Sequence, residues 1–342
     1  PDDGRLYVSI DDAIVQIDAN NDPPMIEIDS DVDAHDIVVD AGFGHLIAAT
    51  ESGELRMWSL DDSSEVGSLS LPSGVSKFTS LAVFGPGSIW ASDAVSLYQG
   101  IYAWDSSTQS FLTTWVKKAD LAPGIDSMAS TMLLISGDVY VGTMGGGVYF
   151  YDVSANSVTE WSTQNTLPSD YITSLTLANT YLLIGTADAG VARRDIATGN
   201  WLATWNDGNW LASNAIHSMS TIGGWAHIIA GDTVHAYNTS SLSFVRTHTM
   251  SSLQLNRDDG SDLIAWPSGG SRAPANNTVL VGDASGLFAE LEPDSNNPHV
   301  GEMLMATGPS DNEMRAVVQI GNIIYIAAGD GIERFDTHQN RW

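Results

Sequence analysis

The chain has 342 residues, 43% of them hydrophobic, so it is long enough to bury a substantial core. Its 42 acidic residues outnumber 13 basic ones and give a formal net charge of −29, which excludes nucleic acid as a partner because such a surface repels phosphates. Cysteine is absent, which excludes disulfides, thiolate metal sites and cysteine nucleophiles, and no apolar run approaches the ~20 residues that span a bilayer.

Two explanations of the acidity remain open. A high-salt or marine extracellular setting would tolerate it, because ions at about 1 M screen charges beyond ~3 Å. Alternatively, many divalent-cation sites would use the carboxylates as ligands. The two explanations are compatible, and the sequence favours the first.

Four short strands separated by turn residues form a unit that recurs along the chain. The clearest copy has strand a at Ile172–Ala178, strand b at Tyr181–Thr186, strand c at Gly190–Asp195 and strand d at Trp201–Trp205. The segments between them are rich in Asn, Asp, Gly and Thr, which are turn formers.

Strand b is predicted eight times, at Leu6–Ile10, His45–Thr50, Ser88–Asp93, Asp138–Thr143, Tyr181–Thr186, Ala226–Asp232, Thr278–Asp283 and Ile323–Gly329. The c strands begin at Ile14, Leu55, Ile101, Val148, Val191, Val234, Leu287 and Ile332. A period in the forties with about four strands per period is the signature of a β-propeller. We therefore predict an all-β fold, a single propeller of four-stranded antiparallel sheets over residues 1–342.

Two residue types recur at fixed places in the unit. A glycine that suits a tight b–c turn precedes strand c at Gly53, Gly100, Gly147, Gly190, Gly286 and Gly331. A tryptophan stands near the end of strand d at Trp115, Trp161, Trp205 and Trp342, where we expect it to fill the gap between neighbouring blades.

Strand a is predicted only seven times, at His35–Ala41, Phe78–Phe84, Ile125–Thr131, Ile172–Ala178, Ile216–Ile222, Leu263–Pro267 and Met314–Ile320. The count favours eight blades whose first blade lacks its inner strand, with seven blades as the alternative. The missing strand would lie upstream in a longer chain, be absent from a three-stranded blade, or come from another subunit by β-augmentation. The opening Pro1-Asp2-Asp3, without an initiator Met, predicts a piece of a longer or processed chain.

The stretch Leu167-Pro168-Ser169-Asp170-Tyr171-Ile172-Thr173-Ser174-Leu175, followed by Ile184-Gly185-Thr186 and Gly190-Val191, carries a family resemblance. Its cognates begin at Leu211, Leu121 and, more loosely, Leu71. The pattern resembles the two-component-regulator type of propeller repeat, within the WD40- and YVTN-like superfamily. The resemblance implies a propeller fold and an extracellular location, and it implies no catalytic residue.

Alternating carboxylates in a loop can converge on one hard cation, and Asp29, Asp31, Asp33 and Asp36 are the best candidates for such a calcium site. The loop lacks the full twelve-residue calcium-binding pattern, so solvated loop acids are the alternative. Calcium is the cofactor that these loop carboxylates would bind.

Residues at the start of strand a often face the central channel of a propeller. Among the equivalent positions, His35, Asp126, His217 and Arg315 are the ones that could form a ligand or metal site at the channel mouth, with polar plugs hydrated by channel water as the alternative. The sequons at Asn238 and Asn276 would accept glycans in an exported protein.

Together these patterns predict a non-enzymatic module of a cell surface, filament or adhesin, with protein partners or self-assembly there and no membrane span in this chain. A ligand-sensing ectodomain is the second hypothesis. A propeller hydrolase or lyase is the third, although the sequence shows no nucleophile or phosphate-loop motif.

Overall fold

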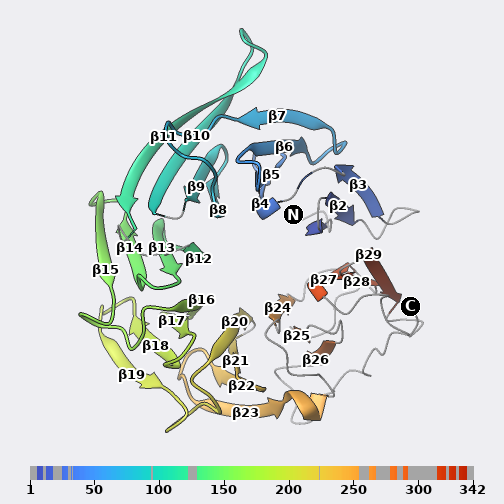
Figure 1. The fold of residues 1–342 in the computed structure, drawn as a ribbon. Coiled ribbons are helices and arrows are strands. Elements are labelled where there is room, and N and C mark those ends of the chain that lie inside the picture. The colour runs from blue at the N-terminus through green and yellow to red at the C-terminus, as the bar shows by residue number, and fades with distance from the viewer. Residues whose placement is uncertain are drawn as a thin grey trace. The chain divides into compact units, whose positions relative to one another are not determined.

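The computed structural model describes residues 6–10, 13–17, 25–29, 32, 34–93, 95–121, 129–222, 224–253, 262–266, 278–282, 288–291, 314–320, 323–328 and 331–336. The chain forms two compact units, residues 1–165 and 166–342. Each unit is a series of antiparallel sheets, labelled by strand in Figure 1. The described part contains one short 3₁₀ helix, η1 (Met250–Leu253), and no helix there could cross a membrane.

The first unit contains four sheets in chain order. Their strands are β1 (Leu6–Ile10), β2 (Ala13–Ile17) and β3 (Met25–Asp29); β4 (Ala34–Asp40), β5 (His45–Thr50), β6 (Leu55–Ser59) and β7 (Glu65–Leu69); β8 (Ser80–Gly85), β9 (Ser88–Ser92), β10 (Ser96–Asp105) and β11 (Ser110–Asp120); and β12 (Ala129–Ile135), β13 (Asp138–Thr143), β14 (Val148–Asp152) and β15 (Ser157–Trp161).

The second unit also contains four sheets among its described residues. Their strands are β16 (Ile172–Ala178), β17 (Tyr181–Thr186), β18 (Val191–Asp195) and β19 (Trp201–Trp205); β20 (Ile216–Ile222), β21 (Trp225–Ala230), β22 (Thr233–Asn238) and β23 (Phe244–Thr249); β24 (Asp262–Trp266), β25 (Thr278–Gly282) and β26 (Phe288–Leu291); and β27 (Met314–Ile320), β28 (Ile323–Ala328) and β29 (Gly331–Asp336).

The repeat unit predicted from the sequence is confirmed as the unit of construction. In every sheet each strand pairs antiparallel with its neighbour in the chain, and five sheets have all four strands. The described part of the first sheet, β1–β2–β3, matches strands b, c and d, as expected for a first copy without strand a. The number of blades in a closed ring, and one domain over residues 1–342, stay predictions.

Two strand predictions are wrong, both in the middle of the first unit. Strand a of the fourth copy was expected at Ile125–Thr131, but β12 runs from Ala129 to Ile135. The segment from Leu121 to this strand is longer than the segments from Leu167 to β16 and from Leu211 to β20, so the strand starts further along the chain.

The second wrong prediction concerns strand c of the third copy. This strand begins not at Ile101 but at Ser96, because β9 ends at Ser92 and the N of Asp93 already donates to the carbonyl of Ser96. Gly100 therefore lies inside β10 rather than in a turn, and it is a glycine because a Cβ there would collide with the ring of Trp115.

Of the predicted b–c corner glycines, Gly53, Gly147 and Gly190 are confirmed, whereas Gly100 is not. Gly147 and Gly190 have positive φ values of 76° and 85°. A Cβ at either position would also run into the backbone carbonyl of the tryptophan that ends strand d, Trp161 or Trp205. Both the turn geometry and this close approach therefore require glycine.

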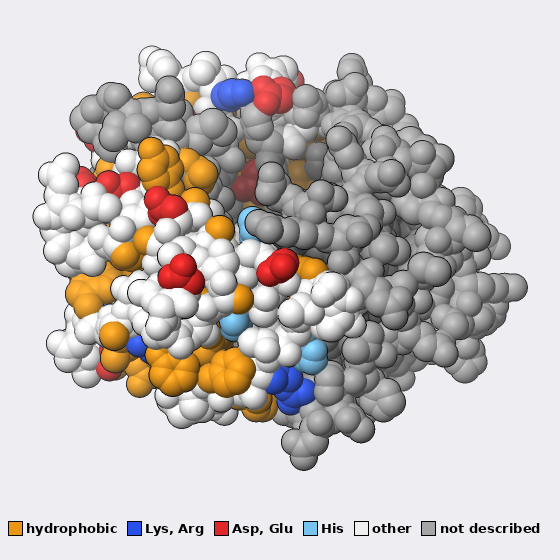
Figure 2. Space-filling model, turned by 60° about the horizontal axis from the view of Figure 1, so that its bottom comes forward, with side chains coloured by type: hydrophobic (Ala, Val, Ile, Leu, Met, Phe, Trp, Pro, Cys, Tyr) orange, Lys and Arg blue, Asp and Glu red, His pale blue; other side chains and the backbone are white. Residues whose placement is uncertain are grey.

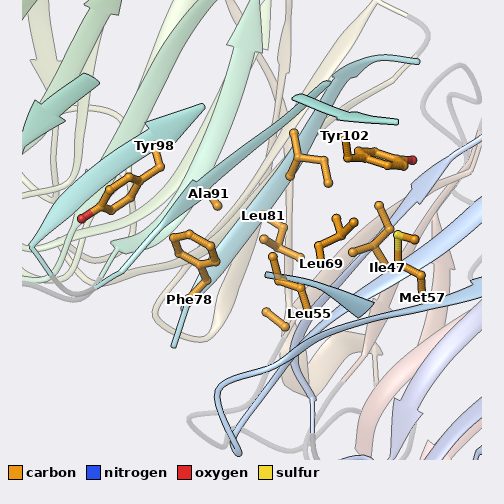
Figure 3. Packing of buried hydrophobic residues seen from close by; sticks show 11 residues of the cluster. Ile47, Leu55, Met57, Leu69, Phe78, Leu81, Ala91, Tyr98 and Tyr102 are labelled. Atoms are coloured by element: carbon orange, nitrogen blue, oxygen red, sulfur yellow. The ribbon is translucent and has the colours of Figure 1, made fainter. Parts of the chain in front are cut away.

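The core lies between neighbouring sheets. In Figure 3, Ile47, Leu55 and Met57 of the β4–β7 sheet point toward Leu81 and Ala91 of the next sheet, and all five side chains are buried. The strand-d tryptophans complete such contacts, as expected: Trp205 is buried and stacks on Tyr237 of the following sheet with ring centroids 4.1 Å apart. Trp161 is also buried, whereas Trp342 lies outside the described residues.

Neighbouring sheets are also joined by a recurring hydrogen bond between their inner strands. Asp36 Oδ2 on β4 accepts from the backbone N of Leu81 on β8 at 2.7 Å. At the equivalent positions of the second unit, Ser174 Oγ on β16 accepts from the N of Met219 on β20 at 3.2 Å. A short polar side chain on one inner strand thus binds a backbone donor of the next inner strand.

Asp40, at the end of β4, makes a second tie to the β8–β11 sheet. Its carboxylate is 1% exposed, and Oδ1 accepts from the N of Gly42 and of Phe43, both at 3.1 Å. Oδ2 accepts from Gly87 N and from Tyr102 Oη, both at 2.7 Å. Burial and this bond raise the pKa of Tyr102 above its ordinary value. Four donors thus satisfy one buried carboxylate.

Asp40→Ala removes the acceptor for all four donors and should lower the free energy of unfolding by about 3 kcal/mol, because buried donors are left unsatisfied. Urea unfolding followed by tryptophan fluorescence measures the loss. Asp138→Ala is the matched control, since Asp138 accepts one bond, from the N of Val153 at an exposed site, and its loss should stay below about 1 kcal/mol. Equal losses in the two variants would contradict the role given to Asp40.

Candidate functional site

The second residue of strand a is an extra, bulged residue in five sheets. On β4, β12, β16, β20 and β27 the register to strand b shifts across one residue, leaving that residue without a Cα partner. The bulged residues are His35, Ser130, Thr173, His217 and Arg315. Bulges redirect a side chain and are frequent beside functional sites. This position is therefore the first candidate site.

Three of the four channel-mouth residues predicted from the sequence occupy this bulge: His35, His217 and Arg315. The fourth, Asp126, lies outside the described residues, and its predicted place at the start of strand a is wrong. Because β12 starts at Ala129, Ser130 occupies the bulge, and its Oγ donates to the carbonyl of Gly142 at 3.1 Å.

Thr173 and His217 hold the bulge of two neighbouring sheets in the second unit. Both residues are partly buried. Thr173 Oγ1 is shielded from solvent and has no hydrogen-bond partner among the residues that the structure describes. A buried hydroxyl without a partner is costly unless a ligand or water completes it, so this bulge is suited to receive a polar group.

The structure describes two of the four predicted calcium ligands, Asp29 and Asp36. Asp29 on β3 is engaged by Arg56, whose Nη2 lies 2.5 Å from Asp29 Oδ2 and 2.8 Å from Glu65 Oε2. The hydrogen bond to Glu65, above all, raises the pKa of Arg56. Asp29 thus takes part in an ionic bridge from the first sheet to the second, which a calcium ion would have to displace.

Among the other three predicted calcium ligands, Asp36 is the one that the structure describes. Asp36 Oδ2 already accepts the hydrogen bond from the N of Leu81, whereas Asp31 and Asp33 lie outside the described residues. Within the described ranges no group of three or more His, Asp and Glu side chains is arranged to hold a metal ion.

One of the two glycosylation candidates, Asn238, lies among the described residues. Asn238 ends β22 and caps the turn that follows, since its Oδ1 accepts from the N of Ser240 and of Ser241, both at 3.0 Å. Asn276 lies outside the described residues. Glycosylation at either position stays a prediction.

The sequence patterns did not single out two exposed aromatic residues of the second unit. Both lie in loops at the end of the sheets at which the a strands begin. Tyr171 and Trp210 are 52% and 51% exposed. Tyr171 and the loop that carries Trp210 (residues 206–214) both contact the b–c corner Ala187–Gly190: Tyr171 O accepts from Ala187 N at 3.0 Å, and Asn214 O accepts from Gly190 N at 2.8 Å. We call this surface, made of Tyr171, Trp210 and residues 187–190, the aromatic loop face.

The backbone beneath Trp210 is held by a network of short polar bonds. Asn209 Oδ1 accepts from Asn206 N at 2.9 Å, and Asn209 Nδ2 donates to Thr204 O at 3.1 Å. Asp207 N donates to Asn214 Oδ1 at 3.0 Å, and the carbonyl of Trp210 accepts from Tyr237 Oη at 2.6 Å. The exposed indole thus stands on a rigid loop.

Two histidines of the β20–β23 sheet, His227 on β21 and His235 on β22, are buried. Their strands pair so that His227 is opposite Ala236 and His235 is opposite Ile228, which places the two rings on opposite faces of the sheet. They therefore form no common metal site. His235 Nε2 accepts from the N of Ala212 at 3.1 Å and so anchors the loop of the aromatic loop face.

No family model and no curated protein matches the chain. Two solved structures resemble it over nearly its full length. The computationally designed protein Ika8 has a TM-score of 0.64 at 17% identity, covering 97% of this chain and 93% of its own. BamB from Moraxella catarrhalis has a TM-score of 0.61 at 15% identity, covering 98% of this chain and 96% of its own.

The fold is a β-propeller. BamB has this architecture, and the repeated antiparallel four-stranded sheets agree with it. At these low identities the likeness shows the fold alone and says nothing of the ligand or partner of this propeller.

Burial lowers the pKa of His235 to about 4, and burial, together with Arg246 and His248, lowers that of His227 to about 4. The unfolded chain gains these protons near the ordinary pKa of 6.5, but the folded chain only near 4. The contribution of these histidines to the free energy of unfolding is therefore greatest above pH 6.5. It falls as the pH drops toward 4, by up to about 1.4 kcal/mol per pH unit for each histidine.

His235→Gln keeps an acceptor for Ala212 N but cannot titrate, so it should flatten this dependence by about one proton between pH 6.5 and 4.5. Urea midpoints across that range measure the slope. Above pH 7 the two curves should run parallel, which serves as the internal control. An unchanged slope below pH 6.5 would show that His235 is not held neutral.

Proposed function

We propose that the propeller is a non-enzymatic interaction module that works outside the cytoplasm, as part of a cell-surface structure, filament or adhesin. The aromatic loop face is its binding surface. The observation that carries the proposal is the pair of half-exposed aromatic side chains, Tyr171 and Trp210, on loops that are already ordered by internal hydrogen bonds.

Rigid aromatic side chains are suited to protein recognition. Tyrosine and tryptophan are enriched among the residues that dominate binding energy, because a large ring buries much area at little entropic cost. A loop held in place by its own bonds also avoids the cost of ordering upon binding. Trp210 satisfies both conditions, because it is an exposed aromatic side chain on a loop held by its own hydrogen bonds.

The charge around this face indicates the kind of partner. Asp170, Asp188 and Asp207 lie on the same loops, within a chain of net charge −29. On the face shown in Figure 2, hydrophobic side chains cluster between separate acidic ones, and Lys and Arg appear at few places. A protein surface that presents apolar groups together with basic ones is complementary to this pattern.

The use of three carboxylates in contacts between sheets supports a non-enzymatic role. Asp36 and Asp40 are each bound to backbone donors of the next sheet, and Asp29 is bound to Arg56. These groups hold sheets together, and their geometry suits that purpose better than proton transfer.

Trp210→Ala and Tyr171→Ala should each weaken binding of the labelled protein to the intact surface of its source cells at least ten-fold, which corresponds to about 1.4 kcal/mol. Binding isotherms of the fluorescently labelled protein measure this. Leu202→Ala, another exposed apolar position in the same unit, is the matched control and should bind as the parent does. A parent protein without saturable binding would overturn the proposed function.

The bulge at Thr173 and His217 favours a second candidate, a ligand-sensing ectodomain. Under this alternative a small polar molecule would complete the buried Thr173 hydroxyl and raise the thermal unfolding midpoint in a saturable way. His217→Ala would abolish that shift, while Tyr171→Ala would leave it unchanged.

A further inference from the structure

The β10–β11 hairpin is the longest in the described part of the chain. β9 pairs with β10 only as far as Ile101, opposite Ser88, whereas β10 and β11 stay paired up to Asp105 and Ser110. The hairpin therefore projects beyond β9, as Figure 1 shows. β11 is the edge strand of this sheet among the described residues.

One face of the hairpin is fixed to the preceding sheet by aromatic rings. Tyr102 lies 5.5 Å from Phe43 between ring centroids, and Phe111 lies 5.1 Å from His45. Tyr102 Oη also donates to Asp40, and Trp115 Nε1 donates to the carbonyl of Ser70 at 2.6 Å. The projection is therefore held rigidly, although β9 does not support it.

The opposite face of the hairpin is apolar and open. Ile101 on β10 is 51% exposed, and Leu112 and Val116 on β11 are 54% and 49% exposed. Ala103 pairs with Leu112, and Ile101 with Thr114, so these side chains lie side by side on one face. We call this surface, made of Ile101, Ala103, Leu112, Thr114 and Val116, the hairpin face.

The hairpin face is also almost free of charge. From Ser96 to Val116 the sequence contains a single charged residue, Asp105, which pairs with Ser110 at the far end of the same face, although charged residues make up 16% of the chain. Two of the three lysines, Lys117 and Lys118, follow directly. Lys117 is paired with Asp120, and Lys118 lies over the ring of Tyr151. In a chain of net charge −29 this is a place where negative charge is locally low.

We propose that the hairpin face is where two copies of this chain associate, packed face to face about a two-fold axis. Two copies that each carry −29 repel one another, and the repulsion is weakest where both surfaces lack acidic groups. A two-fold axis brings one surface patch against itself, so an uncharged apolar patch is complementary to its own copy. This contact rests on the proposed function and supplies its self-assembly step.

The size of the hairpin face sets the strength of the contact. Five small side chains bury much less than the roughly 1,200 Å² of a standard interface, so the dissociation constant lies in the micromolar to millimolar range. Salt should strengthen the contact, because it screens the repulsion between the copies without weakening apolar packing. A contact made of ion pairs would respond to salt in the opposite direction.

Sedimentation equilibrium from about 10 µM to about 1 mM protein, at about 0.1 M and 1 M NaCl, tests the proposal. The average mass should rise from 36.4 kDa toward twice that value, and more steeply at the higher salt. The double variant Leu112→Gln, Val116→Thr keeps the net charge and should weaken association at least ten-fold. Leu202→Gln with Phe244→Gln, at exposed apolar positions elsewhere, is the matched control and should associate as the parent does.

Three results would overturn the proposal: a monomer under all conditions, association that weakens with salt, or a hairpin-face variant that associates like the parent. Each is separable from the proposed function, which is measured by surface binding and depends on Tyr171 and Trp210. A monomer that still binds the cell surface refutes the hairpin contact alone. A dimer that binds nothing refutes the proposed function alone.

Discussion

The arrangement of successive sheets depends on hydrogen bonds between the inner strands of neighbouring sheets. Backbone N–H groups of an inner strand that face the preceding sheet are shielded from water and need an acceptor. Asp36 and Ser174 supply one at equivalent positions, for Leu81 and Met219, and Asp40 supplies a further one for Gly87. The acceptor is a side chain, so the sequence at one position sets how two sheets join. Apolar packing between the sheets is non-directional and would tolerate sliding, which these bonds prevent.

The tie at Asp40 also determines what the β10–β11 hairpin can do. Tyr102 donates to Asp40 and packs with Phe43, so the root of the hairpin is locked to the sheet before it. A projecting two-stranded ribbon is marginally stable by itself in water. Here the aromatic side of the ribbon packs on the preceding sheet and stabilises the ribbon, whereas Leu112 and Val116 on the other side are exposed. The same logic applies to Trp210, whose carbonyl and loop are bound while its indole is exposed.

Much of the fold could be predicted from the sequence because the b–c hairpin is a local structure. Four of the eight b strands, such as His45–Thr50 and Tyr181–Thr186, lie at their predicted residues, since a turn glycine and an apolar run mark them. Gly100 misled the prediction because its reason is not local: it makes room for the Trp115 ring of the neighbouring strand. The prediction of a strand at Ile125 was wrong because the loop length between repeats is not fixed by the repeat itself.

At the candidate sites, the sequence indicated His217 but not that its position is a bulge, which depends on pairing register. It gave no signal for Trp210, because exposure is set by how the loop folds.

The acidity of the chain and its uncharged hairpin face have a common explanation. A net charge of −29 opposes nonspecific contact between copies at every orientation, so the few uncharged surfaces acquire a selectivity that they would not have on a neutral protein. Only an approach that joins two low-charge surfaces avoids most of the repulsion, and the rigid hairpin face with Ile101, Leu112 and Val116 is such a surface. In high salt the repulsion is screened within a few ångströms, and apolar contact then decides the outcome. An acidic propeller in a saline medium would thus associate through this one defined face and not through the rest of its acidic surface.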